Sequence, residues 1–192
     1  MVTLYPIKKY PFIGVCGLDC GLCIRYHTDG KSRCPGCCGP DFFEKHPSCC
    51  FISCAVKNRG LETCAQCPDW QECEHIFQLR QASLTHDSFI SYRPVMSNFA
   101  YICKYGVNKF IQREIEKQKV LIELLNNFDD GRAKLFYCTA CQLINPEEIT
   151  RVIHDVNMSL PPSADIKEKA RTMRSALIKL AQRLKIDLVL RK

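Results

Sequence analysis

The clearest pattern along the chain is an apolar periodicity of three and four residues in the second half. The segment VNKFIQREIEKQKVLIELLNNFDDG, residues 107–131, repeats apolar side chains at this spacing, which is typical of one face of an α-helix. Gly131 follows the last apolar position and is a usual helix stop. We therefore predict a long amphipathic helix. Its apolar face comprises Val107, Phe110, Ile111, Ile115, Leu121, Ile122, Leu125 and Phe128.

A second helix is predicted from a group of start signals in the segment NPEEITRVIHDV. Asn145 is a good N-cap residue, because its side chain can accept a hydrogen bond from a free backbone N–H of the first turn. Pro146 suits the first turn, where its missing N–H costs nothing. Glu147 and Glu148 favour the positive end of the helix dipole. Together these residues predict that a helix begins here.

The last helix is predicted after the helix-breaking pair Pro161-Pro162. Asp165 and Glu168 form a D-x-x-E variant of the capping box. Apolar residues follow in spacings of four and three, and we favour a core-facing stripe because the pattern spans fewer than three heptads. A coiled-coil homodimer is the alternative. The stripe comprises Ile166, Ala170, Met173, Leu177, Leu180 and Leu184. The opposite face is basic, with Lys167, Lys169, Arg171, Arg174, Lys179, Arg183 and Lys185.

The first half of the chain is rich in cysteine instead. Twelve of the fifteen cysteines fall within residues 16–73, interleaved with Gly, Pro, Asp and Ser. This composition predicts metal-knuckle loops joined by short helices, with the best helix candidates at 53–60 and 70–81. We therefore predict a mainly α protein. Its cysteine-rich metal-binding module occupies residues 1–90, and an amphipathic helical region occupies residues 91–192.

So many cysteines need an explanation, because exposed thiols are prone to oxidation. Disulfides belong to oxidising compartments, but the opening stretch MVTLYPIKKYPF lacks the uninterrupted apolar segment of a secretory signal. No apolar run approaches the roughly eighteen residues that suggest a membrane span. We therefore expect a cytoplasmic protein without membrane contact, in which crowded cysteines bind metal or act as redox centres.

The formal charge of +7 is unevenly distributed. Residues 1–100 have ten Lys/Arg against nine Asp/Glu, whereas residues 101–192 have seventeen against eleven. The basic surface therefore belongs to the second half. We expect a protein partner there, and nucleic acid is the alternative, because aromatic residues are not interleaved with the basic ones.

The first group of cysteines has the spacing of a zinc site. Cys20-x2-Cys23 is followed after ten residues by Cys34-x2-Cys37, which gives two knuckles. Each knuckle can present two thiolates, as a tetrahedral four-cysteine zinc site requires. The spacing therefore predicts one zinc ion here.

The second group predicts another zinc site. Cys64-x2-Cys67 supplies one knuckle, and Cys73 can come from the start of the following helix. Either Cys54 or Cys50 can close the tetrahedron, and we prefer Cys54. The alternative, that the cysteines of both groups are merely small buried residues, has less support, since their number and spacing exceed what a core needs.

Two other cysteine patterns leave alternatives open. Cys16-x3-Cys20-x2-Cys23 has the spacing by which radical S-adenosylmethionine enzymes hold a [4Fe–4S] cluster, but the barrel-forming alternation of strands and helices is missing. A cluster without radical chemistry remains an alternative to zinc. Cys138-x2-Cys141 is interpreted first as a buried pair between helices and second as a dithiol.

The order of the cysteines also resembles that of a known family. CGLDCGLC, then CPGCCG, then SCAVKNRGLETCAQCPDWQEC are similar to an uncharacterised cysteine-rich prokaryotic family that opens with a CGLxC motif, a domain of unknown function. The resemblance covers residues 14–80, and DDGRAKLFYCTACQLI is a weaker match to the extension of longer members. It implies a zinc-binding module but no reaction, with Cys38 and Cys49 as extra thiols. The ligands that it implies are Cys16, Cys20, Cys23, Cys34, Cys37, Cys50, Cys54, Cys64, Cys67 and Cys73.

The sequence is compatible with three functions. We favour a binding or adaptor protein stabilised by about two zinc ions, because closed four-cysteine sites leave no coordination position for a substrate. An iron–sulfur electron carrier or redox accessory protein is the alternative, since it uses the same thiolates. The third is alkyl transfer or metal delivery by a zinc thiolate. No Ser/His/Asp order, phosphate loop or pair of carboxylates favours another enzyme.

Overall fold

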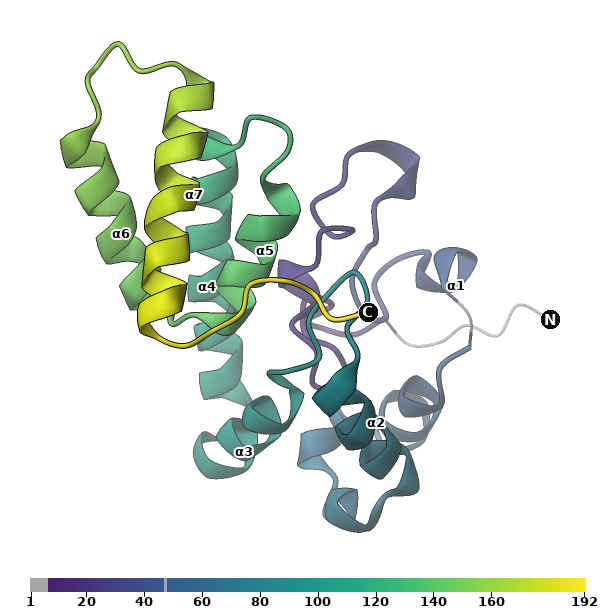
Figure 1. Ribbon diagram of the computed structural model, residues 1–192. Coiled ribbons are helices and arrows are strands. Elements are labelled where there is room, and N and C mark those ends of the chain that lie inside the picture. The colour runs from purple at the N-terminus through teal and green to yellow at the C-terminus, as the bar shows by residue number, and fades with distance from the viewer. Residues whose placement is uncertain (1–6, 47) are drawn as a thin grey trace.

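The computed structural model describes residues 7–46 and 48–192, and this part of the chain is mainly helical without a strand, as predicted (Figure 1). The α-helices are α1 (Phe42–Lys45), α2 (Glu74–Thr85), α3 (Val95–Tyr105), α4 (Val107–Phe128), α5 (Lys134–Leu143), α6 (Pro146–Ser159) and α7 (Ile166–Arg183). The shorter turns are η1 (Cys20–Leu22), η2 (Gly30–Ser32), η3 (Ile52–Asn58), η4 (Cys64–Gln66) and η5 (Trp70–Glu72). Of these five turns, η3 is π-helical and the others are 3-10 turns.

The predicted starts and stops of the long helices are confirmed. The side chain of Asn145 accepts a hydrogen bond from the backbone N–H of Glu147 at 3.3 Å and caps α6. Asp165 caps α7 in the same way, accepting from the N–H of Glu168 at 2.8 Å. Gly131 lies beyond the end of α4 with φ of 87°, a conformation that favours glycine. Local sequence therefore determines the residues at which these helices begin and end.

Helices α1, α3 and α5 were not predicted individually, and α5 carries two of the cysteines. Its residues Tyr137, Cys138 and Cys141 are buried, and the Tyr137 hydroxyl donates to the carbonyl of Phe128 at 2.9 Å. The Cys-x2-Cys spacing that resembles a metal knuckle is also the spacing of one helix face. Burial of the two cysteines, our first interpretation, is confirmed.

The later helices form one apolar core. Helices α4, α5, α6 and α7 lie side by side in Figure 1, and buried side chains of α5, α6, α7 and the second half of α4 belong to a single cluster. The central part of the α7 stripe is buried here, while its end residues Ile166 and Leu184 are 44% and 39% exposed. The stripe therefore faces the core of its own chain, as predicted. Its buried members are Ala170, Met173, Leu177 and Leu180.

A second core lies under the cysteine-rich coil. It includes Ile13 and Ile52 from the coil, Phe99 from α3 and Phe110 from the first half of α4, all fully buried. The apolar packing thus changes from one core to the other within α4. That residues 1–90 form a separate module stays a prediction.

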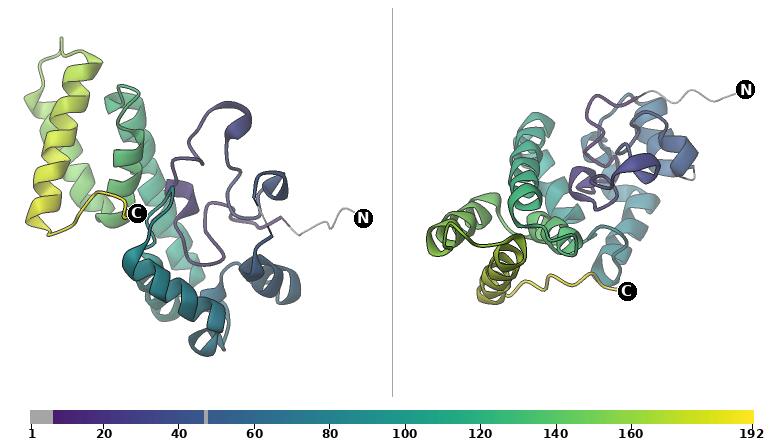
Figure 2. Two further views of the ribbon diagram at one scale, coloured as in Figure 1. Left: turned by 45° about the vertical axis from the view of Figure 1, so that its right-hand side comes forward. Right: turned by 90° about the horizontal axis from the view of Figure 1, so that it is seen from above.

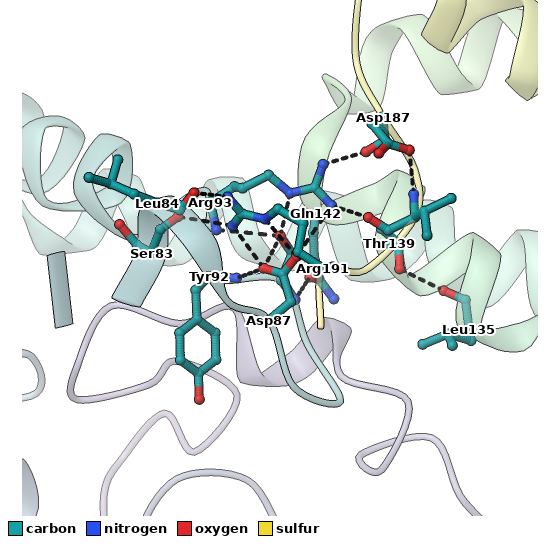
Figure 3. A network of polar contacts seen from close by, with 12 residues as sticks. Ser83, Leu84, Asp87, Tyr92, Arg93, Leu135, Thr139, Gln142, Asp187 and Arg191 are labelled. Atoms are coloured by element: carbon teal, nitrogen blue, oxygen red, sulfur yellow. Dashed lines mark hydrogen bonds and ion pairs between the residues drawn. The ribbon is translucent and has the colours of Figure 1, made fainter. Parts of the chain in front are cut away.

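Residues beyond α7 run as an extended segment back across the molecule, toward the loop between α2 and α3 (Figure 2). There the buried carboxylate of Asp87 accepts hydrogen bonds from the backbone N–H of Arg191 at 2.8 Å and of Tyr92 at 2.7 Å. The Arg191 guanidinium donates to the same carboxylate at 3.1 Å (Figure 3). Arg93 donates to the carbonyl of Val189 at 2.9 Å. These contacts fasten the extended segment to the first half of the chain.

Within the part of the chain that the structure describes, none of the helices combines the length and the apolar character needed to cross a membrane.

Candidate metal centre

The backbone of Val15 brings two sets of cysteines together. Its N–H donates to Sγ of Cys37 at 3.4 Å, and its carbonyl accepts from the N–H of Cys64 at 2.8 Å. The hydroxyl of Thr63 donates to the same carbonyl at 3.2 Å. Cys16 follows Val15 directly in the chain. Cys16 therefore lies between the knuckle that contains Cys37 and the knuckle that contains Cys64, although Cys64 is 48 positions later in the sequence.

We define the first thiol cluster as Cys37 and the four cysteines whose pKa its charge raises. Burial, and then the charges of Cys37 and Cys49, raise the pKa of Cys16 to about 12. Burial and the same Cys37 raise the pKa of Cys20 well above its ordinary value. These thiols therefore stay protonated at neutral pH unless a cation compensates their charge. The members of the cluster are Cys16, Cys20, Cys37, Cys38 and Cys49.

One member of the first thiol cluster differs from the others. A hydrogen bond from Cys38 lowers the pKa of Cys37 to about 7 against the opposing effect of burial, and the charge of Lys8 lowers it further. Lys8 is only 4% exposed; its ammonium donates to the carbonyl of Ile13 at 2.6 Å and lies 3.8 Å from Glu62. The cluster thus has a buried cation beside its most acidic thiol.

The second thiol cluster lines a small hollow of about 40 Å³. Apolar side chains such as Trp70 and Ile76 line the rest of its wall. Burial raises the pKa of Cys64, and the thiolates of Cys16 and Cys54 add to the shift. Five cysteines from three stretches of the chain therefore line this hollow. They are Cys50, Cys54, Cys64, Cys67 and Cys73.

Local sequence explains much of the second thiol cluster. Thr63 and Gln66 form a capping box around η4, so that Cys64 begins this turn and Cys67 ends it. Cys73 is the N-cap residue of α2, where the sequence predicted a ligand. The guanidinium of Arg59 donates to Sγ of Cys67 at 2.8 Å.

The structure gives the four cysteines of the first predicted site different neighbours. Cys20 and Cys37 lie in the first thiol cluster, whereas Cys34 lies with its Sγ 3.3 Å from Nε2 of His46. The charge of Cys34, after burial, raises the pKa of Cys23, which places these two near each other. Cys34 and Cys37 thus have different neighbours, while the charge of Cys23 also raises the pKa of Cys20. Which of these cysteines bind metal stays a prediction.

Sequence reasoning missed several neighbours of the sulfurs. The adjacent cysteines Cys49 and Cys50 contribute to different thiol clusters, and the doubled cysteines of the sequence were the signal that could have indicated this. No spacing in the sequence marks His46 as a neighbour of Cys34. Burial, and then the charges of Arg25 and Lys45, lower the pKa of His46 and favour the neutral ring.

Besides Cys23 and Cys34, three further cysteines lie outside both thiol clusters. Cys103 is exposed on α3, and its Sγ is 3.8 Å from the carbonyl of Ala65. Cys138 and Cys141 are buried in α5. Burial raises the pKa of Cys138 to about 12, so it remains a neutral thiol at pH 7.

The residues of the two thiol clusters fit a thiophilic metal by their chemistry. In residues 7–46 and 48–192, however, no three Cys, His, Asp or Glu side chains are arranged to hold a metal ion without movement. Ligation therefore requires side-chain rotation, which cysteine achieves about a single bond. Because their thiolates raise one another's pKa, a divalent cation would reverse the electrostatic cost of ionising them.

Comparison with known proteins adds no relative. No family model, no curated protein and no solved structure matches the chain. The resemblance of residues 14–80 to the CGLxC family therefore stays a prediction that rests on the order of the cysteines.

Proposed function

We propose that the chain is a binding or adaptor protein whose cysteine-rich part is stabilised by about two zinc ions, one in each thiol cluster. The observation that carries the proposal is that five cysteines line one small hollow in the second thiol cluster. Zinc prefers sulfur ligands, and four of the five suffice for a closed tetrahedral site. A closed site has no position for a substrate, so its role is structural.

The energetics of the first thiol cluster support the same proposal. Without a cation its thiols are buried and mutually unfavourable as thiolates, since Cys16, Cys20 and Cys49 all have raised pKa values. Zinc displaces their protons and converts the repulsion into metal–sulfur bonds. The metal would then contribute directly to the folding of a segment whose turns are short.

The contact surface of the adaptor would be the exposed face of α7. Lys167, Arg171 and Lys179 are exposed there, and Arg174 lies over the ring of Phe136 with 5.5 Å between its guanidinium carbon and the ring centroid. A row of cations at helical spacing suits an acidic protein surface. We propose a protein partner, which would separate the two roles: the zinc sites support the fold, and α7 provides recognition.

The first test is elemental analysis of the chain purified without oxygen, together with its visible spectrum. About two zinc ions per chain and no visible absorption would support the proposal. Iron with acid-labile sulfide and a broad visible band would overturn it in favour of an iron–sulfur carrier, which uses the same cysteine donors.

A matched pair of variants assigns the metal to the thiol clusters. We expect Cys64→Ser to lose one zinc ion and to make residues 48–80 sensitive to protease. Cys103→Ser serves as the control, because Cys103 is exposed on α3 outside both clusters. Equal zinc content in the two variants would contradict the assignment.

A further inference from the structure

A cysteine and a histidine outside both thiol clusters already stand at the separation of two metal ligands. Sγ of Cys34 lies 3.3 Å from Nε2 of His46. In a tetrahedral zinc site, with Zn–S of about 2.3 Å and Zn–N of about 2.0–2.1 Å, neighbouring sulfur and nitrogen ligands are about 3.5 Å apart. The two atoms therefore need little movement to share an ion.

Contacts within α1 and across to the preceding loop hold the imidazole in this position. The ring of His46 stacks on the ring of Phe42, with centroids 4.4 Å apart and planes inclined by 7°. Its backbone N–H donates to the carbonyl of Phe42 at 3.0 Å. The ammonium of Lys45 donates to the carbonyl of Arg33 at 2.8 Å and so ties the end of α1 to the residue before Cys34.

Cys23 is the nearest candidate for a third ligand. The N–H of Cys34 donates to the carbonyl of Arg25 at 2.8 Å, which places Cys34 beside the segment that contains Cys23. At present Sγ of Cys23 donates to the carbonyl of Phe89 at 3.7 Å, a long and weak contact. Rotation of this side chain away from Phe89 costs little and leaves the sulfur available.

We infer that Cys34, His46 and Cys23 form a third metal centre, distinct from the two thiol clusters, for zinc or a similar thiophilic divalent cation. Two thiolates and one neutral imidazole give a complex without net charge. Three protein ligands leave one coordination position open, and all three residues are partly exposed. This centre therefore exchanges its ion, or binds an added ligand, more readily than a closed site does.

Zinc titration followed by native mass spectrometry tests the inference on the full chain. We expect wild type to bind one ion more than His46→Ala at the same free zinc concentration. His154→Ala is the matched control, because His154 is exposed on α6, and it should bind as many ions as wild type. Cys34→Ser should lose the same ion as His46→Ala.

A measurement on the wild type covers the case in which a variant does not fold. Diethylpyrocarbonate modifies free imidazoles, so peptide mapping should find His46 modified in the metal-free chain and protected after zinc is added. His154 should be modified in both. Equal modification of His46 with and without zinc would overturn the inference.

The outcomes separate this centre from the proposed function. Loss of an ion in Cys64→Ser but not in His46→Ala refutes the third centre and leaves the thiol clusters as zinc sites. Loss in His46→Ala but not in Cys64→Ser supports the third centre alone. A wild-type chain that binds no zinc refutes both.

Discussion

The attachment of residues 184–192 leads to a quantitative prediction for Arg191→Ala. The side chain of Asp87 is 0% exposed, and its carboxylate accepts two hydrogen bonds of 3.1 Å from the Arg191 guanidinium (Figure 3). That guanidinium also donates to the carbonyls of Ser83 at 2.9 Å and Leu84 at 2.6 Å. One side chain therefore joins the extended segment to the end of α2 through four hydrogen bonds.

The magnitude follows from what the substitution leaves behind. Asp87 keeps hydrogen bonds from the Tyr92 N–H at 2.7 Å and the Ser91 hydroxyl at 3.1 Å, and Arg93 lies 3.6 Å away. These contacts offset part of the loss, which for an unpaired buried charge reaches about 3–5 kcal/mol. We expect a decrease in the free energy of unfolding of about 2–3 kcal/mol, or roughly 5–10 °C in Tm.

The effect should depend on pH. Burial opposes ionisation of Asp87, but the hydrogen bonds from Arg191, Tyr92 and Ser91 together outweigh it and hold the pKa of the carboxyl well below its ordinary value. A depressed pKa in the folded state stabilises the protein above the unfolded pKa of about 3.9, and this stabilisation is lost as the pH falls through the folded pKa. The difference between wild type and Arg191→Ala should therefore be full at pH 7 and shrink below about pH 4.

Urea unfolding followed by circular dichroism measures the difference at pH 7 and pH 3. Lys192→Ala is the control, since it removes a neighbouring exposed cation and should change stability by less than about 0.5 kcal/mol. Limited proteolysis should cleave residues 184–192 faster in Arg191→Ala. Equal stability of the two variants at pH 7 would refute the reasoning.

Three further predictions concern the helical part. Burial, and then the charge of Asp19, raise the pKa of Glu114 to about 7, so the stability of the wild type should fall as the pH rises from about 4.3 to 7. Glu114→Gln should remove this decline in urea titrations at several pH values. The same decline in both proteins would contradict the prediction. Leu177→Ala should cost about 2–5 kcal/mol in the same assay, because Leu177 is fully buried, whereas a cost below 1 kcal/mol would argue against the packing of α7. Tyr137→Phe should cost about 1 kcal/mol through its lost hydrogen bond to Phe128, and no change would mean that this bond adds nothing.

The long helices could be predicted because their signals are local. Asn145 and Asp165 cap the helices that follow them, and the apolar spacing of α7 is that of its buried face. Helix α5 was not predicted, because the Cys138-x2-Cys141 spacing is typical of a metal knuckle as well as of one helix face. Short elements without caps have no such local signature.

The grouping of the cysteines could be predicted only in part. Spacing defines a knuckle such as Cys64-x2-Cys67, because both residues belong to one turn. Which knuckles meet depends on long-range backbone contacts, such as those of Val15 with Cys37 and Cys64. A contact of this kind leaves no pattern in the sequence. The position of His46 beside Cys34 likewise depends on the tie between α1 and Arg33.

The most direct test of the central claim is the metal content of the chain purified without oxygen, before and after treatment with a strong chelator. We predict about two tightly held zinc ions per chain, apart from the exchangeable ion of the third centre, and no visible absorption. We also predict that the cysteine-rich part becomes protease-sensitive after chelation while α4 to α7 persist. Iron with acid-labile sulfide would contradict the zinc assignment. Unchanged protease resistance of residues 7–80 after complete metal removal would contradict the claim that metal stabilises the fold.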